Sequence, residues 1–223
     1  MKLAILFSGG KDSTYAAWLA KKEGYKTSCL ITLESENQDS YMFHTPSVSK
    51  TKRQAEAMKI PLLIQKTKGK KEAELQDLKK AIKKAKTKYK IEGIVTGAVE
   101  SVYQASRIQK ICDELNLECF NPLWQKDQIE LLEDLIKSKF KVIITGVSAY
   151  PLNSSWLGRV IDNKFISEVK DLQERYKINP AGEGGEFETF VLEAPKLFKK
   201  SLKIKNAKIS GEKNSWRMEV DLC

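Results

Sequence analysis

The 223-residue sequence has a single histidine, only four cysteines and no long hydrophobic run. A membrane-spanning helix needs roughly 20 consecutive apolar residues, and no stretch approaches that length, so we expect none. The chain opens on a strand pattern and not on a signal peptide, which favours a cytoplasmic location. Cys29, Cys112, Cys119 and Cys223 form no C-x-x-C pair, which argues against a zinc knuckle and a disulfide framework. His44 is therefore the one candidate for any imidazole-dependent step.

The composition is that of a soluble globular protein, with 41% hydrophobic and 30% charged residues. The length suffices for one large or two modest domains, each with its own core. The formal net charge is +10, and lysine supplies most of it. Such an excess fits stability at high temperature, or contact with RNA, ribosomes or an acidic protein. Composition does not separate these interpretations.

The segment around which the chain is organised is residues 8–13, SGGKDS. It follows the apolar run 3–7 and precedes the helical pattern 14–22, so a strand, a glycine-rich turn and a helix start come in succession. Glycines permit backbone angles closed to other residues, which lets successive N–H groups point into one concavity. The helix N-terminus adds its partial positive charge. We therefore predict a phosphate-binding loop here.

The side chains of this loop suit a nucleotide. Ser8 and Ser13 supply hydroxyl donors, Lys11 supplies an ammonium group, and Asp12 can contact a phosphate-bound magnesium ion. The segment does not fit G-x-x-x-x-G-K-[ST]. It resembles the SGGxDS signature of PP-loop ATP pyrophosphatases, which cleave ATP between its α and β phosphates. The alternative is an ordinary glycine-rich turn capped by Ser or Asp.

Strand and helix patterns alternate through the first half of the chain. We expect strands at residues 3–7, 27–33, 61–65, 93–96 and 117–120, with helices between them. This alternation predicts an α/β fold with a doubly wound, mostly parallel, Rossmann-like sheet. With strand order 3-2-1-4-5, the ligand site lies at the reversal between strands one and four. Residues 8–13 and the segment that begins at Gly97 are then neighbours.

A lysine-dense stretch, residues 66–90, carries apolar residues at helical spacing and is expected to form an amphipathic helix. Its basic face is either solvated or a docking face for an acidic or RNA-bearing partner. Asn121-Pro122 marks the expected domain boundary. We assign residues 1–120 to an ATP-binding domain and residues 121–223 to a smaller α+β substrate-binding domain. The latter has helix patterns near 129–136 and 165–176 and ends in a predicted hairpin with its turn at 211–214.

A second glycine-rich segment, residues 181–190 (AGEGGEFETF), holds three carboxylates, Glu183, Glu186 and Glu188. Carboxylates are unfavourable to bury unpaired, so such a loop is poor core material and suits a cation, a metal or a substrate. The alternative is a flexible acidic turn before a strand.

Together these segments resemble the diphthine–ammonia ligase family of the PP-loop superfamily. The resemblance spans nearly the whole chain. It rests on SGGKDS at 8–13, MFHT at 42–45, TGA at 96–98 with Tyr103, Gln104 and Arg107, NPLW at 121–124, and EGGEFET at 183–189. It implies the last step of diphthamide synthesis, in which ATP and ammonium amidate diphthine on elongation factor 2 through an acyl-adenylate, with release of AMP and pyrophosphate. It also implies ATP and magnesium as cofactors and no requirement for nucleic acid.

The resemblance assigns roles to residues at matching positions. The β and γ phosphates are assigned to Ser8, Gly9, Gly10, Lys11, Asp12 and Ser13, and the ribose or α-phosphate to Gly97. Tyr103 and Arg107 complete the expected nucleotide site. Binding of the ammonium ion or of the quaternary amine of the substrate is assigned to Glu183, Gly184, Gly185, Glu186, Glu188 and Thr189. The candidates for a catalytic role are Lys11, Asp12, Glu183, Glu186 and His44.

Several alternatives stay open at this level. His44 is either catalytic or merely packed between its neighbours. Arg107, four residues after Tyr103, either contacts a phosphate or carboxylate or forms a surface ion pair. Free ammonium is the expected donor, because the chain has no room for a glutamine-hydrolysing domain. The competing functions are a PP-loop enzyme that modifies tRNA, favoured by the net charge, and an ATP-binding sensor without turnover.

Overall fold

The computed structural model describes residues 1–35, 48–68 and 71–223. The chain divides into two compact units, Met1–Trp124 and Gln125–Cys223. Each unit is described below by itself.

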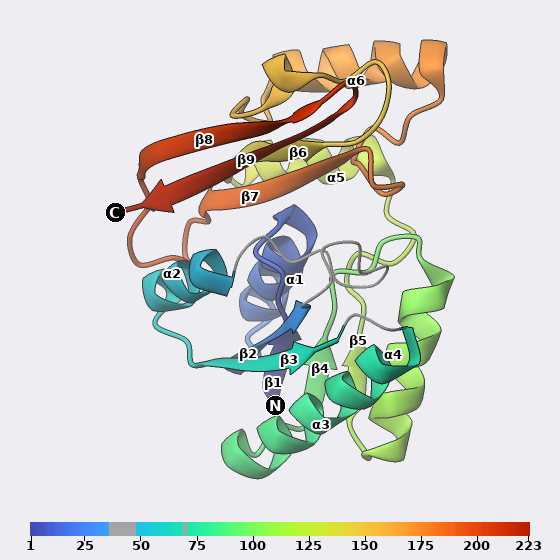
Figure 1. Ribbon diagram of the computed structural model, residues 1–223. Coiled ribbons are helices and arrows are strands. Elements are labelled where there is room, and N and C mark those ends of the chain that lie inside the picture. The colour runs from blue at the N-terminus through green and yellow to red at the C-terminus, as the bar shows by residue number, and fades with distance from the viewer. Residues whose placement is uncertain (36–47, 69–70) are drawn as a thin grey trace. The chain divides into compact units, whose positions relative to one another are not determined.

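The first unit is an open α/β sheet (Figure 1). Its elements are β1 (Lys2–Leu6), α1 (Lys11–Lys22), β2 (Lys26–Ser35), α2 (Val48–Met58), β3 (Leu62–Thr67), α3 (Lys71–Tyr89), β4 (Gly93–Val95), α4 (Val102–Glu114) and β5 (Glu118–Phe120). The five strands lie in the order β3-β2-β1-β4-β5, and all four pairings are parallel. The predicted α/β class, strand order and doubly wound sheet are confirmed.

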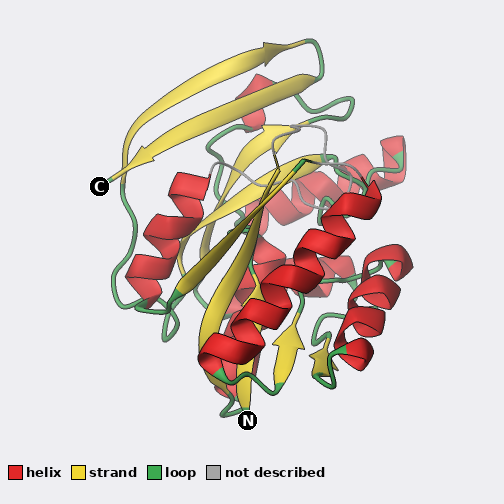
Figure 2. Ribbon diagram, turned by 60° about the horizontal axis from the view of Figure 1, so that its bottom comes forward, coloured by secondary structure: helices red, strands yellow, loops and turns green. Residues whose placement is uncertain are grey.

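Helices cover both faces of this sheet (Figure 2). Helices α3 and α4 share one apolar cluster with the strands, in which Leu78 and Ile82 of α3 meet Ile108 of α4. The strands contribute Ala4 and Ile31 among others. Because side chains alternate between the faces of a strand, Leu3 and Ile5 point to the opposite face. Helix α1 lies on that side of the sheet.

The lysine-dense stretch forms the expected amphipathic helix. Leu78, Ile82 and Ala85 of α3 are fully buried, and Lys80 and Lys83 are exposed. One expectation from the helical pattern is wrong. Apolar residues of this pattern are expected to point inward, but Val102 is 66% exposed, because it is the first residue of α4 and lies just beyond the cap at Ser101.

The second unit packs two helices on an antiparallel sheet. Its elements are α5 (Gln128–Lys137), β6 (Lys141–Val147), η1 (Ser154–Trp156), α6 (Asn163–Tyr176), β7 (Phe187–Glu193), β8 (Ile204–Glu212) and β9 (Ser215–Leu222). The strand order is β7-β6-β9-β8. Phe165 of α6 stacks edge-on against Trp156 and Phe187, with ring centroids 5.5 and 5.7 Å apart. The expected α+β character is confirmed, and β8 and β9 form the predicted final hairpin.

Across the described ranges, no helix has both the length and the apolar character that a membrane crossing requires.

Candidate active site

The segment 8–13 runs from the end of β1 into the first turn of α1. The helix begins at Lys11, three residues earlier than the sequence pattern predicts, so Lys11, Asp12 and Ser13 belong to its first turn. Gly10 occupies the N-cap position, and no side chain caps the helix there. The first N–H groups of a helix lack intrahelical acceptors. This end of α1 is therefore suited to an anion.

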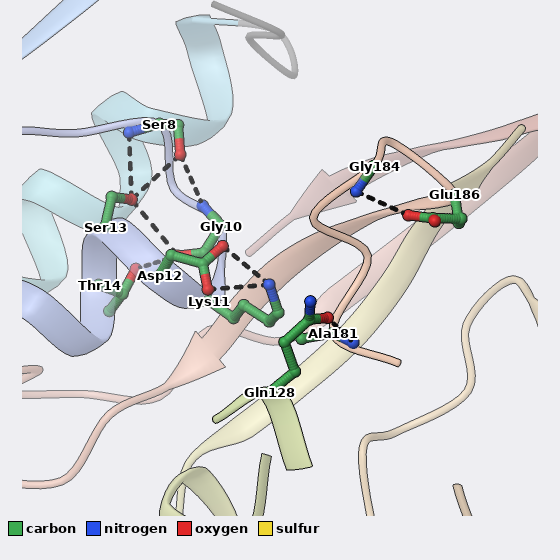
Figure 3. A network of polar contacts seen from close by, with 10 residues as sticks. All are labelled: Ser8, Gly10, Lys11, Asp12, Ser13, Thr14, Gln128, Ala181, Gly184 and Glu186. Atoms are coloured by element: carbon green, nitrogen blue, oxygen red, sulfur yellow. Dashed lines mark hydrogen bonds and ion pairs between the residues drawn. The ribbon is translucent and has the colours of Figure 1, made fainter. Parts of the chain in front are cut away.

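Hydroxyl groups hold the turn together (Figure 3). The Ser13 Oγ accepts from the Ser8 backbone N–H at 3.2 Å and lies 3.1 Å from the Ser8 Oγ. The Gly10 carbonyl accepts from the Thr14 hydroxyl at 2.8 Å and from the Thr14 N–H at 3.2 Å. These bonds turn the Gly10 carbonyl into the helix. Ser8, Gly10 and Ser13, three predicted phosphate contacts, are thus brought together.

Gly9 has a conformation that only glycine adopts readily. Its φ is +85°, and a Cβ at this position would overlap the side-chain oxygen of Gln54. Gln54 lies on α2 and donates from Nε2 to the Gly9 carbonyl at 2.9 Å. The sequence reasoning missed Gln54, because it is 45 residues away in a helix without any motif.

The segment after β4 lies against the start of α1, as the strand order predicts. A Cβ at Gly97 would come within 2.6 Å of the Ser13 backbone nitrogen and 2.8 Å of the Asp12 carbonyl carbon. The Thr96 hydroxyl accepts from the Ala98 N–H at 3.1 Å and donates to Asn121 Oδ1 at 2.5 Å. Two motifs, TGA and NPLW, are therefore linked behind the phosphate loop.

The Lys11 ammonium contacts both oxygens of Asp12, each at 2.8 Å (Figure 3). Asp12 is the predicted contact of a phosphate-bound magnesium ion. A cation at this carboxylate has to compete with the Lys11 ammonium. Binding of a polyphosphate would relieve that competition, because it offers Lys11 other negative oxygens.

Tyr103 and Arg107 form a stacked pair on α4. The Arg107 guanidinium carbon lies 3.4 Å from the centroid of the Tyr103 ring, a cation–π geometry. Arg107 Nη1 is also 3.5 Å from the Tyr103 carbonyl oxygen. The described contacts of Arg107 are thus with Tyr103 of the same helix, and its contact with a phosphate or carboxylate stays a prediction.

The thiols behind this segment have shifted acidity. A hydrogen bond with the Cys112 thiol, and a second from the Asn121 amide, lower the pKa of Cys119 below its usual value against the opposing effect of burial. The same pairing raises the pKa of Cys112. Burial raises the pKa of Cys29 to about 12. Cys29 and Cys112 are fully buried core residues.

The second glycine-rich segment forms two successive turns before β7. The Gly182 N–H donates to the Asn179 carbonyl at 2.9 Å, and the Gly185 N–H donates to the Gly182 carbonyl at 3.0 Å. Gly182 and Gly185 have φ of +78° and +85°. The Ser148 N–H, just after β6, donates to the Glu186 carbonyl at 2.8 Å. The positions of Gly182 and Gly185 therefore match the two turns, each of which needs a residue with a positive φ.

The Glu186 carboxylate closes this loop from inside (Figure 3). Its Oε1 accepts from the Asn179 backbone N–H at 2.8 Å and from Asn179 Nδ2 at 2.9 Å. Its Oε2 accepts from the Gly184 N–H at 2.9 Å. Both oxygens thus act within the loop, and Glu186 has a structural task that the sequence did not reveal.

A glutamine from α5 supports the same loop. Gln128 Oε1 accepts from the Ala181 N–H at 3.0 Å, and Gln128 Nε2 donates to Asn179 Oδ1 at 3.1 Å. Gln128 is also a residue that sequence reasoning missed, about fifty positions before the loop.

The remaining predicted residues of the loop lie along its exit into β7. Glu188 pairs with Gly146 across the sheet, and a Cβ at Gly146 would be 3.2 Å from a Glu188 carboxylate oxygen. Thr189 pairs with Ile144. Glu183 and Thr189 are half-buried, as is Glu188.

His44 and the MFHT motif lie outside the described residues. No group of three or more His, Cys, Asp or Glu that could hold a metal ion occurs within residues 1–35, 48–68 and 71–223.

Comparisons with known proteins cover almost the whole chain. A family model described as the diphthamide synthase N-terminal domain matches residues 1–119, and one described as its C-terminal domain matches residues 127–222. The diphthine–ammonia ligase of Mus musculus is 36% identical, covering 91% of this chain and 82% of that protein. The diphthine–ammonia ligase of Homo sapiens is 34% identical, covering 94% and 85%.

Among solved structures, a predicted subunit of a tRNA methyltransferase from Methanocaldococcus jannaschii matches with a TM-score of 0.48 and 19% identity, covering 88% of this chain and 98% of that chain.

Proposed function

The chain belongs to the diphthamide synthase family, and we propose that it is a diphthine–ammonia ligase that amidates diphthine with ammonium at the expense of ATP. The observation that carries this proposal is the match of both units to the two domains of the family, over residues 1–119 and 127–222. The proposed protein substrate is elongation factor 2, and the proposed location is therefore the cytoplasm.

The phosphate loop supports the use of ATP. Three features suit the loop to the oxygens of a polyphosphate. Gly9 has a positive φ, the first turn of α1 has no side-chain cap, and Gly97 packs directly against the backbone of that turn. Backbone N–H groups at such a turn bind anions. We assign the β and γ phosphates to residues 8–13 and the ribose or α-phosphate to Gly97. Asp12 is the proposed contact for a phosphate-bound magnesium ion, which supplies charge neutralisation.

The proposed reaction has two steps that balance. A carboxylate oxygen of diphthine bonds to the α-phosphorus of ATP as the bond to the β-phosphate oxygen breaks, which gives an acyl-adenylate and pyrophosphate. Ammonia, formed when ammonium loses a proton, then attacks the acyl carbon, loses a second proton, and AMP leaves. In this scheme Lys11 stabilises the charge on the departing pyrophosphate, because its ammonium lies at the loop that holds the phosphates.

The second loop is the proposed site for the cations. Carboxylates attract both ammonium and the quaternary amine of diphthine. Glu186 acts by shaping the loop, since both its oxygens accept from loop N–H groups. We therefore propose Glu183 and Glu188 for cation contact, with Gly184, Gly185 and Thr189 forming the surrounding surface. Tyr103 and Arg107 are proposed to lie near the nucleotide, and His44 keeps its proposed catalytic role.

The test is a reconstituted reaction with purified protein, ATP, magnesium, ammonium chloride and elongation factor 2 that carries diphthine. We expect AMP and pyrophosphate in equal amounts, and mass spectrometry should show the carboxylate converted to an amide. Elongation factor 2 lacking diphthine is the control and should give neither product. Release of ADP, or ATP-dependent modification of tRNA in place of the factor, contradicts the proposal. Binding of ATP without turnover on any acceptor points to the sensor.

A further inference from the structure

The inference concerns Gln54, a residue of α2 that belongs to no recognised motif. Its side chain is fully buried, and its Nε2 donates to the Gly9 carbonyl at 2.9 Å. Thr51, one turn earlier on the same helix, is also fully buried, and a Cβ at Gly9 would lie 3.4 Å from its Cγ2. Helix α2 thus presents a polar amide to one specific peptide group of the phosphate loop.

The bonded carbonyl belongs to the peptide between Gly9 and Gly10. In a trans peptide the C=O and the next N–H point in opposite directions within one plane. A bond that fixes the Gly9 carbonyl therefore also fixes the direction of the Gly10 N–H. This peptide is flanked by two glycines, and Gly9 has a φ of +85°, so side-chain sterics do little to restrain its rotation.

The other groups of Gly10 leave its N–H available to an incoming oxygen. The Gly10 carbonyl accepts from Thr14, which ties that end of the residue into α1. The Gly10 N–H makes one long contact, 3.4 Å, with the Ser8 hydroxyl oxygen. A donor so weakly engaged at the start of a helix is suited to a phosphate oxygen.

We propose that Gln54 is a positioning residue that keeps the Gly9–Gly10 peptide oriented with its N–H toward the pyrophosphate portion of ATP. This rests on the proposed function in one respect, that residues 8–13 bind ATP. Without the Gln54 donor the peptide can rotate, and the Gly9 carbonyl oxygen then replaces the Gly10 N–H opposite the phosphates. A donor to the anion is exchanged for a like-charged dipole end, so affinity falls.

Two near-isosteric substitutions test the donor itself. Gln54→Met keeps the length and removes the amide. Gln54→Glu keeps the shape and, when ionised, has no proton to donate, whereas a protonated glutamic acid has one O–H donor. The defect of Gln54→Glu should therefore shrink as the pH is lowered, and the defect of Gln54→Met should not. A role limited to packing predicts that Gln54→Met, which keeps the length of the side chain, binds both ligands like the wild type.

The measurement is isothermal titration calorimetry with inorganic pyrophosphate and with ATP, in the absence of protein substrate and over a range of pH. For Gln54→Met we expect affinity for both ligands to fall about tenfold, the effect of losing one net hydrogen bond to the anion. Gln54→Glu should show at least that loss at neutral pH, relative to the wild type at the same pH. Gln109→Met on α4, where the side chain bonds Asp113 at an exposed site, is the matched control and should bind like the wild type.

Each result bears on the inference independently of the amidation reaction. Equal pyrophosphate affinity in wild type and Gln54→Met overturns it, as does a Gln54→Glu defect that ignores pH. If Gln54→Met unfolds, Gln54→Glu still tests the inference, because the ratio of its affinity to that of the wild type at the same pH should rise toward one as the pH is lowered. A wild-type protein that binds pyrophosphate but never amidates diphthine refutes the proposed function and leaves the inference on Gln54 testable.

Discussion

Each of the two glycine-rich loops is held by a glutamine from a helix, but the direction of the hydrogen bond differs. In the first loop Gln54 Nε2 donates to the Gly9 carbonyl, whereas in the second loop Gln128 Oε1 accepts from the Ala181 N–H. Each glutamine thus fixes a peptide group of a different loop. The first loop is otherwise held by hydroxyl groups, and its two charged side chains, Lys11 and Asp12, contact each other.

The second loop uses one of its own charges for support. Glu186 accepts three hydrogen bonds from N–H groups within residues 179–184. The comparison teaches that a charged residue in a glycine-rich motif can serve to hold the loop itself. In the first loop neutral groups bond the backbone, whereas in the second loop a carboxylate does so.

The largest expected effect comes from crowding the first loop. Gly97→Ala places a Cβ 2.6 Å from the Ser13 nitrogen, where only backbone can give way. We expect a stability loss of about 1–3 kcal/mol from overpacking, and loss of ATP affinity on the order of 10²-fold from displacement of the loop. Calorimetric titration with ATP and thermal unfolding measure the two effects.

Gly24→Ala is the matched control for that change. Gly24 has a φ of +87° but nothing within 4 Å of an added Cβ. Its expected stability loss is similar, about 1–2 kcal/mol from the left-handed backbone, yet its ATP affinity should equal that of the wild type. If both variants lose ATP affinity alike, general destabilisation and not the loop explains the result.

The second prediction tests whether Glu186 holds the second loop in shape or takes part in the reaction. Glu186→Ala leaves three N–H groups without their acceptor, and misplacement of the loop should lower the amidation rate on the order of 10²-fold. Glu186→Gln keeps one acceptor oxygen and should lower the rate about tenfold. ATP affinity should change in neither. A Gln variant as inactive as the Ala variant, with unchanged thermal stability in both, would instead mark Glu186 as a catalytic charge.

The third prediction compares the two glutamines directly. Gln128→Leu removes the acceptor of the Ala181 N–H and the donor to Asn179, at an expected cost of about 1–3 kcal/mol in stability. It should lower the amidation rate at saturating ATP and leave ATP affinity unchanged, the reverse of Gln54→Met. Steady-state kinetics with the diphthine-bearing factor, alongside ATP titrations, give the contrast. A shared pattern in both variants would contradict the separate tasks of the two loops.

The sequence predicted the frame of the first unit and the location of both loops for physical reasons. Strand and helix periodicity predicted the order of the elements, and the strand order predicted that Gly97 lies beside residues 8–13. The close packing of Gly97 against the Ser13 backbone confirms this. The supports could not be predicted. Gln54 and Gln128 stand in helices whose visible signal is apolar periodicity, and their bonds join residues more than forty positions apart.

The structure also assigns tasks that composition could not separate. Three glutamates in one short acidic loop look equivalent in sequence, yet Glu186 is bonded on both oxygens within the loop and Glu188 faces Gly146 on β6. The start of α1 at Lys11 likewise depends on the Gly10 carbonyl bonding Thr14. Glycine-rich sequences carry no such signal, because they allow many backbone paths.

The smallest expected effect concerns the thiols behind the first loop, for which the second loop has no counterpart in the described contacts. Cys119 is bonded by Cys112 and by Asn121, and these bonds lower its pKa. Cys112→Ala removes the larger contribution, so the pKa of Cys119 should rise and its alkylation should shift to higher pH. At pH 7 the labelling rate should therefore fall, while ATP affinity stays the same. Cys223, exposed at the chain end, is the internal reference, and Cys29, with its pKa raised to about 12, should stay unlabelled. Peptide mass mapping after timed alkylation follows each thiol, and an unchanged pH profile for Cys119 would show that Cys112 does not control it.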